Sequence, residues 1–129
     1  QKDISNEVRE ADARQAIHRR KFEAELQNWL QSDGLDPQLV DVREDGELEI
    51  APFPVPVVHL PLSRSEAWLP ELDQKLQHDR PVVVLCHAGV RSLHFGLWLL
   101  EQNPSLEVWN LEGGIDAWSV QVDPSVARY

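Results

Sequence analysis

The chain has 129 residues, which is enough for one domain and too few for two ordinary ones. Hydrophobic residues make up 42% of it, so a globular core is expected, whereas a net charge of -10 disfavours nucleic acid or an anionic membrane as the main partner. Its apolar runs are shorter than the roughly 20 residues of a transmembrane helix, and the polar N-terminus does not resemble a secretory signal.

The chain contains one cysteine and five histidines. One cysteine cannot form an intramolecular disulfide, which favours a reducing compartment, and we therefore expect a cytoplasmic location. The same count excludes a thiolate metal cluster, and the histidines lack the spacing of metal ligands, so no metal is expected.

The N-terminal part of the chain divides into an extension and a helix. Residues 1–20 are polar and highly charged, and they predict either a mobile or loosely docked extension or a helix with a thin apolar stripe. We therefore place the folded domain in residues 21–129. Within it, apolar residues recur at helical spacing from 22 to 30, which predicts an amphipathic helix that ends near Gly34.

Four short apolar runs predict strands. They comprise residues 38–42, 57–60, 82–85 and 106–110. The run 82–85 is continuous rather than alternating, as expected of a central strand that is buried on both faces. The alternate prolines of Ala51–Pro56 exclude a helix ahead of the second strand.

The segments that follow these strands predict helices. Ser63 is expected to cap a short helix, and a further helix should extend up to Asp79. Residues 93–100 predict a long helix that starts near Ser92, and Gly113-Gly114 predicts a turn into a short final helix. Because strand and helix alternate, we predict an α/β fold with a central, mainly parallel sheet flanked by helices on both faces.

The loop from Cys86 to Ser92 carries the candidate chemistry. In open parallel sheets, ligands bind outside the carboxyl ends of the strands, which is where Cys86 lies. Gly89 permits a close turn, Arg91 offers a cation, and loop amides next to a helix N-terminus can converge on an anion. These features favour a reactive thiolate over the alternative, an inert buried cysteine.

Four ordered blocks resemble the single-domain rhodaneses, a family of sulfurtransferases with an α/β fold. Cys86-His87-Ala88-Gly89-Val90-Arg91-Ser92 is similar to the family's active-site loop, C-x-x-G-x-R-S. Residues 39–44 are similar to its L-[IV]-D-V-R-E block, residues 60–63 to [IL]-P-L-S, and residues 111–118 to L-x-G-G-[IL]-x-A-W. The resemblance implies that residues 21–129 form a rhodanese-like domain.

The resemblance also implies a mechanism that needs no cofactor. Cys86 would take sulfane sulfur from a small donor such as thiosulfate, or from a protein persulfide, and pass it as a persulfide to a nucleophilic acceptor. Backbone amides of the loop would hold the anionic sulfur with help from Arg91, while Asp41 and Arg43 would brace the strand and the loop. The loop residues concerned are His87, Ala88, Gly89, Val90, Arg91 and Ser92.

Two segments refine the resemblance. Ala51–Pro56 replaces the family's G-H-[IV]-P-G-A segment, so we expect an altered wall at the entrance to the site. Residues 117–129 resemble the end of rhodanese domains fused to adenylyltransferases of the ubiquitin-activating type, which implies a ubiquitin-like sulfur carrier as the acceptor. The alternative is that this ending only packs under the sheet, as in stand-alone relatives.

Two other functions compete with sulfur transfer. A phosphatase or arsenate reductase of the cell-cycle-phosphatase type would share the fold, but such enzymes place five residues between cysteine and arginine, whereas four intervene here. A noncatalytic rhodanese-like binding module is the other alternative, although such modules commonly lack the cysteine. His87 is either a passive loop residue or one that tunes the choice of donor, and His94 is expected on a helix face.

Overall fold

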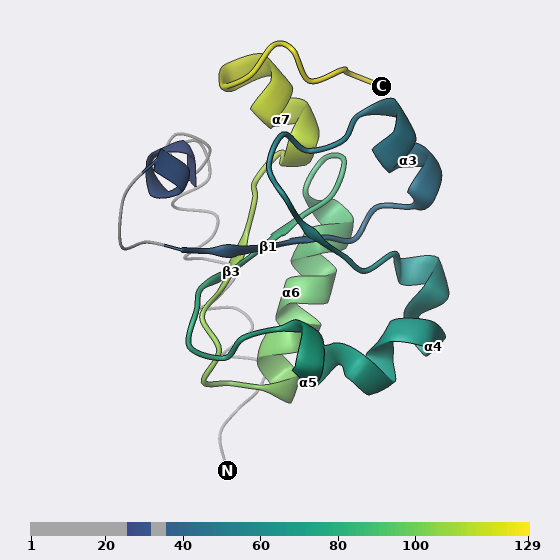
Figure 1. Ribbon diagram of the computed structural model, residues 1–129, viewed down its shortest axis with the longest axis vertical. Helices are drawn as coiled ribbons and strands as arrows, with labels where there is room; N and C mark the ends of the chain where they lie inside the picture. Colours follow the sequence, from purple (N-terminus) through teal and green to yellow (C-terminus); the bar gives the residue numbers. More distant parts are fainter. Residues whose placement is uncertain (1–25, 32–35) are drawn as a thin grey trace.

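The computed structural model describes residues 26–31 and 36–129 (Figure 1). Residues 26–31 are helical, as expected, whereas the predictions for residues 1–20 and for Gly34 lie outside the described residues. Within the described ranges, no helix combines the length and apolar character needed to cross a membrane. The same ranges contain no group of three or more His, Cys, Asp or Glu side chains that could hold a metal ion.

Four parallel strands form the central sheet in the order β2-β1-β3-β4. They are β1 (Gln38–Asp41), β2 (Val58–His59), β3 (Val82–Leu85) and β4 (Val108–Asn110). Each lies within a predicted run, and the predicted parallel α/β sheet is confirmed. Because β1 and β3 pair from Gln38 opposite Val82 to Asp41 opposite Leu85, their carboxyl ends are level. The residues that follow these two strands therefore meet at one edge of the sheet.

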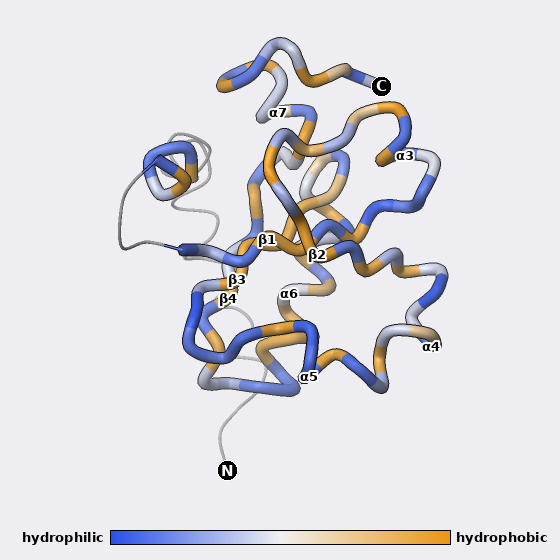
Figure 2. Tube along the Cα trace, in the orientation of Figure 1, coloured by the Kyte–Doolittle hydropathy of each residue, from blue (hydrophilic) through white to orange (hydrophobic). Residues whose placement is uncertain are grey.

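Helices cover both faces of the sheet (Figure 1). Val40 and Val84 pack into the layer of α4 (Ser65–Trp68), α5 (Leu72–Lys75) and α6 (Val90–Gln102). Leu39 and Val83 pack into the opposite layer, which contains the helix of residues 26–31 and α7 (Gly114–Gln121). The central strands β1 and β3 are buried along their whole length, and Figure 2 shows the hydrophobic character of this central part of the chain.

Helix α3 (Asp45–Ile50) corresponds to no predicted element. Its start carries a capping box, in which the Glu44 side chain accepts from the Glu47 backbone and the Glu47 carboxylate accepts from the Glu44 amide at 3.2 Å. The E-x-x-E spacing is the local signal for such a helix start. The helix ends at Ile50 and Ala51 is its non-helical C-cap, because Pro52 follows. The placement of α3 after β1 brings Glu47 to the carboxyl edge of the sheet.

The prediction that Ser63 caps a helix is wrong. Ser63 lies within the 3-10 turn η1 (Leu62–Arg64), and α4 begins after it at Ser65 without a side-chain cap. The Ser63 amide and hydroxyl donate instead to the Glu44 carboxylate, at 3.1 and 2.5 Å. A long-range partner has therefore replaced the local cap.

Two helix boundaries differ from prediction by a few residues. After the 3-10 turn η2 (Leu69–Glu71), α5 ends at Lys75, short of the expected Asp79, because the next residue is extended. Helix α6 begins at Val90, ahead of the expected start near Ser92, because Gly89 caps it with a φ of 96°. The left-handed backbone of this glycine lets the helix start inside the predicted anion-binding loop.

The start of α7 packs directly against the loop that follows β3. Gly113 and Gly114 have φ values of 75° and 62°, and a Cβ on Gly114 would collide with the carbonyl oxygens of Cys86 and His87. These two carbonyls accept hydrogen bonds of 2.9 and 3.0 Å from the next two amides of α7. The Gly-Gly turn therefore allows the close approach that holds the beginning of the loop.

The proline-rich segment Ala51–Pro56 is not helical, as predicted. Its Phe53 is buried and packs on Trp118 of α7, with ring centroids 5.0 Å apart. This segment therefore contributes to the core on the α7 side of the sheet.

Candidate active site

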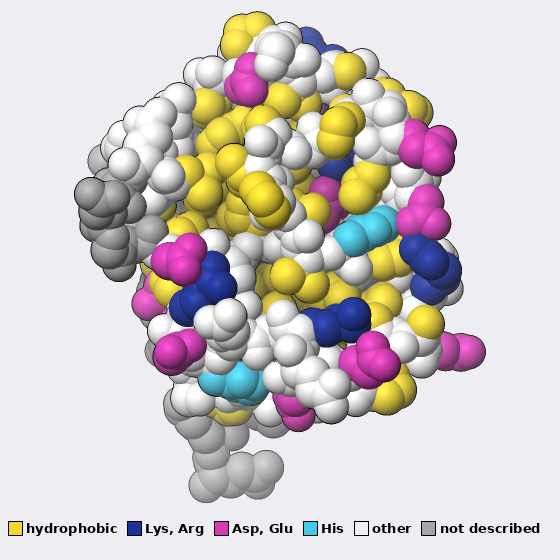
Figure 3. Space-filling model, viewed as in Figure 1, with side chains coloured by type: hydrophobic (Ala, Val, Ile, Leu, Met, Phe, Trp, Pro, Cys, Tyr) yellow, Lys and Arg dark blue, Asp and Glu magenta, His cyan; other side chains and the backbone are white. Residues whose placement is uncertain are grey.

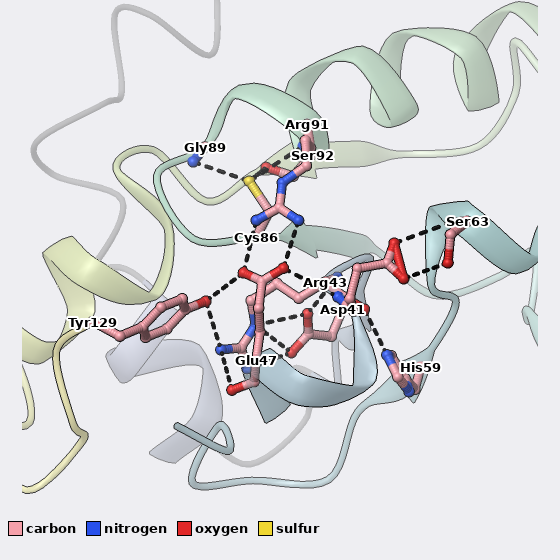
Figure 4. Close-up of polar contacts among 11 residues, drawn as sticks. Asp41, Arg43, Glu47, His59, Ser63, Cys86, Gly89, Arg91, Ser92 and Tyr129 are labelled. Atoms are coloured by element: carbon pink, nitrogen blue, oxygen red, sulfur yellow. Dashed lines mark hydrogen bonds and ion pairs between the residues drawn. The ribbon is translucent and has the colours of Figure 1, made fainter. Parts of the chain in front are cut away.

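Cys86 directly follows β3 at the edge where β1 and β3 end together. Its side chain belongs to the hydrophobic cluster on the α6 side, with Val84 and Phe95 as members, and the residue is 1% exposed. Figure 4 shows its sulfur facing the first turn of α6. The cysteine thus lies just below the surface at the edge where parallel sheets bind their ligands.

Three hydrogen-bond donors converge on the sulfur of Cys86 (Figure 4). The amide of Gly89 lies 3.1 Å from Sγ, the amide of Ser92 3.4 Å and the hydroxyl of Ser92 3.3 Å. Because Gly89 is the N-cap of α6, the positive end of this helix also faces the sulfur. Such a concave set of donors favours a sulfur anion over a neutral group.

Asn110, the last residue of β4, supports two of these donors and is absent from the predicted site. Its Nδ2 donates to the Gly89 carbonyl at 3.0 Å, and its Oδ1 lies 2.5 Å from the Ser92 hydroxyl oxygen, whose single proton can bond either to Oδ1 or to Cys86 Sγ. The residue is 4% exposed, and it lies beside Val84 in the sheet register. A polar residue at the carboxyl end of a buried strand is the signal that could have indicated it.

Replacing Asn110 by alanine is expected to cost about 1–3 kcal/mol of unfolding free energy, because the buried Ser92 hydroxyl and Gly89 carbonyl would lose a partner. Urea unfolding at constant pH measures this loss. Asn103→Ala, which removes exposed hydrogen bonds to His78 and Ser105, is the control and should cost about 0.5 kcal/mol or less. Equal losses in the two variants would contradict a supporting role for Asn110.

Asp41 and Arg43 form an ion pair in which both side chains are 0% exposed. Arg43 Nη2 lies 2.8 Å from Asp41 Oδ2, and Nε lies 3.0 and 3.1 Å from the two carboxylate oxygens. Burial by itself would lower the pKa of Arg43, but the hydrogen bonds to Asp41 and Tyr129 raise it above its ordinary value. Arg43 also donates to the Glu47 carbonyl and the Tyr129 hydroxyl, so the pair joins the end of β1 to α3 and to the C-terminal segment. Its bracing of the Cys86 loop and its effect on any reaction stay predictions.

Arg91 forms a two-point ion pair with Glu47 of α3 (Figure 4). The Nη1–Oε1 and Nη2–Oε2 distances are 2.7 and 2.8 Å. Hydrogen bonding to Arg91 lowers the pKa of Glu47 to about 2, so the carboxylate is charged at neutral pH. The predicted cation of the loop is therefore matched by an anion that is not among the predicted site residues. The spacing of Glu44 and Glu47 indicates that a helix starts here, but it does not show which distant residue the Glu47 carboxylate contacts.

Tyr129 completes the network and is likewise absent from the predicted site. Its hydroxyl donates to Glu47 Oε2 at 2.7 Å and accepts from Arg43 Nη1 at 3.1 Å. Burial raises the pKa of Tyr129 to about 12, so this hydroxyl keeps its proton at neutral pH. The ring meets the His87 ring nearly edge-on, with centroids 4.2 Å apart. The C-terminal segment thereby connects α3, the end of β1 and the Cys86 loop.

The other loop residues differ in exposure. Ala88 and Val90 are exposed, Val90 at 63%, whereas His87 is partly buried. The Nδ1 atom of His87 is buried without a hydrogen-bond partner in the described part of the chain. The amides that bond to Cys86 Sγ in this structure are those of Gly89 and Ser92, so a role for every amide of the loop in holding sulfur stays a prediction.

A mostly apolar groove of about 430 Å³ adjoins Arg91, between α6 and the turns around α4. Figure 3 shows one face of the molecule, on which hydrophobic side chains are exposed among charged ones. His94 is exposed and lines the groove, consistent with the expected position on a helix face. The lining residues are Leu62, Ser65, Trp68, Leu69, Arg91, His94, Phe95 and Trp98.

Comparison with known proteins identifies the family. The family model described as rhodanese-like domain matches residues 23–121, which include every strand of the sheet and the whole Cys86 loop. The chain belongs to the rhodanese-like domain family. The resemblance that the four sequence blocks carry is confirmed by this match.

Relatives of this rhodanese-like domain include proteins named as sulfurtransferases. The putative sulfurtransferase YtwF of Bacillus subtilis is 34% identical over 86 residues, which cover 67% of the chain and 77% of YtwF. The rhodanese-like/PpiC domain-containing protein 12, chloroplastic, of Arabidopsis thaliana is 42% identical over 73% of the chain, but the match covers 31% of the plant protein. The adenylyltransferase and sulfurtransferase MOCS3 of Drosophila willistoni is 32% identical over 70% of the chain and 21% of MOCS3. The chain therefore spans less than a third of the plant and fly proteins.

Solved structures share the fold of this rhodanese-like domain. A rhodanese-like domain protein from Staphylococcus aureus aligns with a TM-score of 0.62 and 25% identity, covering 83% of this chain and 94% of that protein. A Rhodopseudomonas palustris protein of unknown function, described as a possible tyrosine phosphatase, aligns with a TM-score of 0.65 over 99% of this chain and 95% of that protein. At 20% identity, the second likeness shows the fold alone. The predicted rhodanese-like fold is confirmed.

Proposed function

We propose that this domain is a sulfurtransferase that carries sulfane sulfur as a persulfide on Cys86. One observation carries the proposal: two amides and a hydroxyl converge on Cys86 Sγ at the carboxyl end of β3. The names of YtwF and MOCS3 support this class of reaction. No cofactor enters the proposed chemistry, because the sulfur atom itself is the transferred group.

The proposed first step loads Cys86. Its thiolate attacks the outer sulfur of the donor, the new S–S bond forms, and the S–S bond of the donor breaks. Thiosulfate then releases sulfite with the bonding electron pair, whereas a protein persulfide releases a thiolate. The loop His87–Ser92 would hold the resulting Cys86 persulfide anion by its backbone amides and the Ser92 hydroxyl; the Gly89 and Ser92 amides and this hydroxyl already contact the sulfur, which supports that role.

The proposed second step unloads Cys86. A nucleophilic acceptor, such as a thiol, cyanide or a carrier protein, attacks the outer sulfur, and the Cys86 thiolate leaves. The Cys86 thiolate that leaves accepts hydrogen bonds from the same amides as the thiolate that attacks in the first step. These donors would therefore stabilise the negative charge on Cys86 in both steps.

Phosphoryl or arsenate chemistry has less support. The interval of four residues between Cys86 and Arg91 forms a smaller loop than the five-residue interval of cell-cycle-type phosphatases. The Gly89 and Ser92 amides approach the sulfur atom itself. A compact ring of this kind fits one sulfur atom better than a tetrahedral phosphate.

A noncatalytic binding module is the second candidate, and one observation favours it. Cys86 is 1% exposed, and the neighbouring Arg91 is already paired with Glu47. In such a module the loop would serve as a structural element, and Cys86 would take up no sulfur from any donor.

Mass spectrometry of the donor-treated protein separates the two candidates. The protein is incubated with thiosulfate or, separately, with glutathione persulfide, and its intact mass is measured. We expect the mass of one added sulfur atom, located on Cys86 after alkylation and digestion, and its removal by cyanide as thiocyanate. A folded protein that gains no sulfur from either donor would refute the sulfurtransferase proposal and favour the binding module.

The acceptor is proposed to be a ubiquitin-like sulfur carrier protein. The proposal rests on the ending of residues 117–129 and on the name of MOCS3, which combines an adenylyltransferase with a sulfurtransferase. A cytoplasmic location and the lack of nucleic-acid or membrane partners stay predictions from composition and cysteine content.

A further inference from the structure

The charges around Cys86 are balanced in pairs. Asp41 neutralises Arg43 below the surface, and Glu47 neutralises Arg91 beside the loop. Both terminal nitrogens of Arg91 donate to the Glu47 carboxylate, so the paired donors with which an arginine binds an anion are used on a side chain of the protein itself. An anionic donor that approaches Cys86 therefore meets a carboxylate beside the one cation of the loop.

The carboxylate of Glu47 is fixed at this place. The capping box holds its backbone and one oxygen at the start of α3, and the Tyr129 hydroxyl donates to the other oxygen at 2.7 Å. The side chain is 20% exposed, so its charge is only partly screened by solvent. Figure 4 shows Glu47, Tyr129 and Arg91 gathered on the same side of the Cys86 loop.

The groove next to Arg91 adds an apolar wall. Trp68, Phe95 and Trp98 line it together with Arg91 itself. A donor whose sulfur is attached to an uncharged organic group can contact this wall, whereas an inorganic dianion gains nothing from it.

We infer that Glu47 is a specificity-determining residue that selects sulfur donors of low negative charge and disfavours dianions such as thiosulfate. This inference rests on the proposed sulfurtransferase function and names its donor class, an organic persulfide or a comparable monoanion. Tyr129 acts as a positioning residue, because it orients Glu47.

Two donors of the same chemistry isolate the effect of charge. Thiosulfate carries two negative charges, loses sulfite and leaves one sulfur on Cys86. Methanethiosulfonate anion, CH3SO2S⁻, carries one negative charge, loses methanesulfinate and leaves the same persulfide. In each case the Cys86 thiolate forms one S–S bond while the S–S bond of the donor breaks, and the leaving group takes the electron pair.

The test compares kcat/KM of the full chain for these two donors, with cyanide as acceptor and at constant ionic strength. Glu47→Gln removes one negative charge and keeps the shape of the side chain. We expect kcat/KM to rise about tenfold for thiosulfate and about threefold for methanethiosulfonate, because the repulsion scales with the charge of the donor. Glu101→Gln is the matched control: it makes the same change of net charge at the opposite end of α6 and should leave both values within about twofold.

The outcomes are distinct. An equal change for both donors, or no change, in folded Glu47→Gln would overturn the selectivity and leave the proposed function standing. If Glu47→Gln does not fold, Tyr129→Phe provides the test, since it removes one of the contacts that fix the carboxylate and keeps the carboxylate itself. The thiosulfate value should then rise about twofold to threefold relative to the monoanion, and an unchanged ratio overturns the inference. Failure of both donors to load Cys86 in the wild-type protein would overturn the proposed function and the inference with it.

Discussion

Replacing Cys86 by serine is expected to lower the rate of sulfur transfer by about 1,000-fold or more. A serine hydroxyl is a far weaker nucleophile toward sulfur at neutral pH, and its oxygen cannot form a persulfide. Because the chain has one cysteine, no other thiol can take over the covalent step. The rate is measured as thiocyanate formed from an organic persulfide and cyanide.

The fold is expected to survive this change, since a serine oxygen can accept the hydrogen bonds that Gly89 and Ser92 give to the sulfur. Urea unfolding of the variant checks this point. Ser92→Ala is the companion variant, because it keeps the nucleophile and removes the hydroxyl that lies 3.3 Å from the sulfur; a loss of about tenfold to a hundredfold is expected. Cys86→Ser turnover within tenfold of wild type would contradict covalent transfer through Cys86.

Replacing Asp41 by asparagine is expected to cost about 3–5 kcal/mol of unfolding free energy. The change leaves Arg43 charged and 0% exposed, and it turns one carboxylate oxygen that accepts from the guanidinium into an NH2 group. Because the ordinary pKa of an arginine side chain lies far above neutral pH, Arg43 keeps its proton in the variant and its buried charge stays unpaired. The midpoint of urea unfolding measures the loss.

Two further variants distinguish the cost of an unpaired buried charge from other losses of stability. Asp45→Asn removes the partner of Arg64, in a pair whose side chains are 62% and 56% exposed, and should cost about 1 kcal/mol or less. The double variant Asp41→Leu/Arg43→Met removes both buried charges and should recover a large part of the stability lost in Asp41→Asn. A double variant less stable than Asp41→Asn would show that the hydrogen bonds of Arg43, rather than its unpaired charge, dominate the cost.

The local sequence determined the sheet, the order of its elements and the position of the Cys86 loop. The continuous run 82–85 is apolar because both faces of β3 are covered, so its burial could be predicted without knowing which helices cover it. Cys86, Gly89 and Ser92 lie within one loop, and the short interval between them already limits where their polar groups can point. Patterns that act over a few residues were therefore sufficient for these features.

The tertiary structure alone decided which distant residues complete the site. Glu47, Asn110 and Tyr129 come from α3, β4 and the C-terminal segment, and no spacing in the chain relates them to Cys86. The wrong prediction for Ser63 has the same origin, since the partner of its hydroxyl, Glu44, is brought near by the crossover between β1 and β2. The sequence by itself thus specified the candidate nucleophile and its loop. The packing of separate elements at the carboxyl edge of the sheet specified the charge balance around it, because that balance depends on distances in space rather than on intervals along the chain.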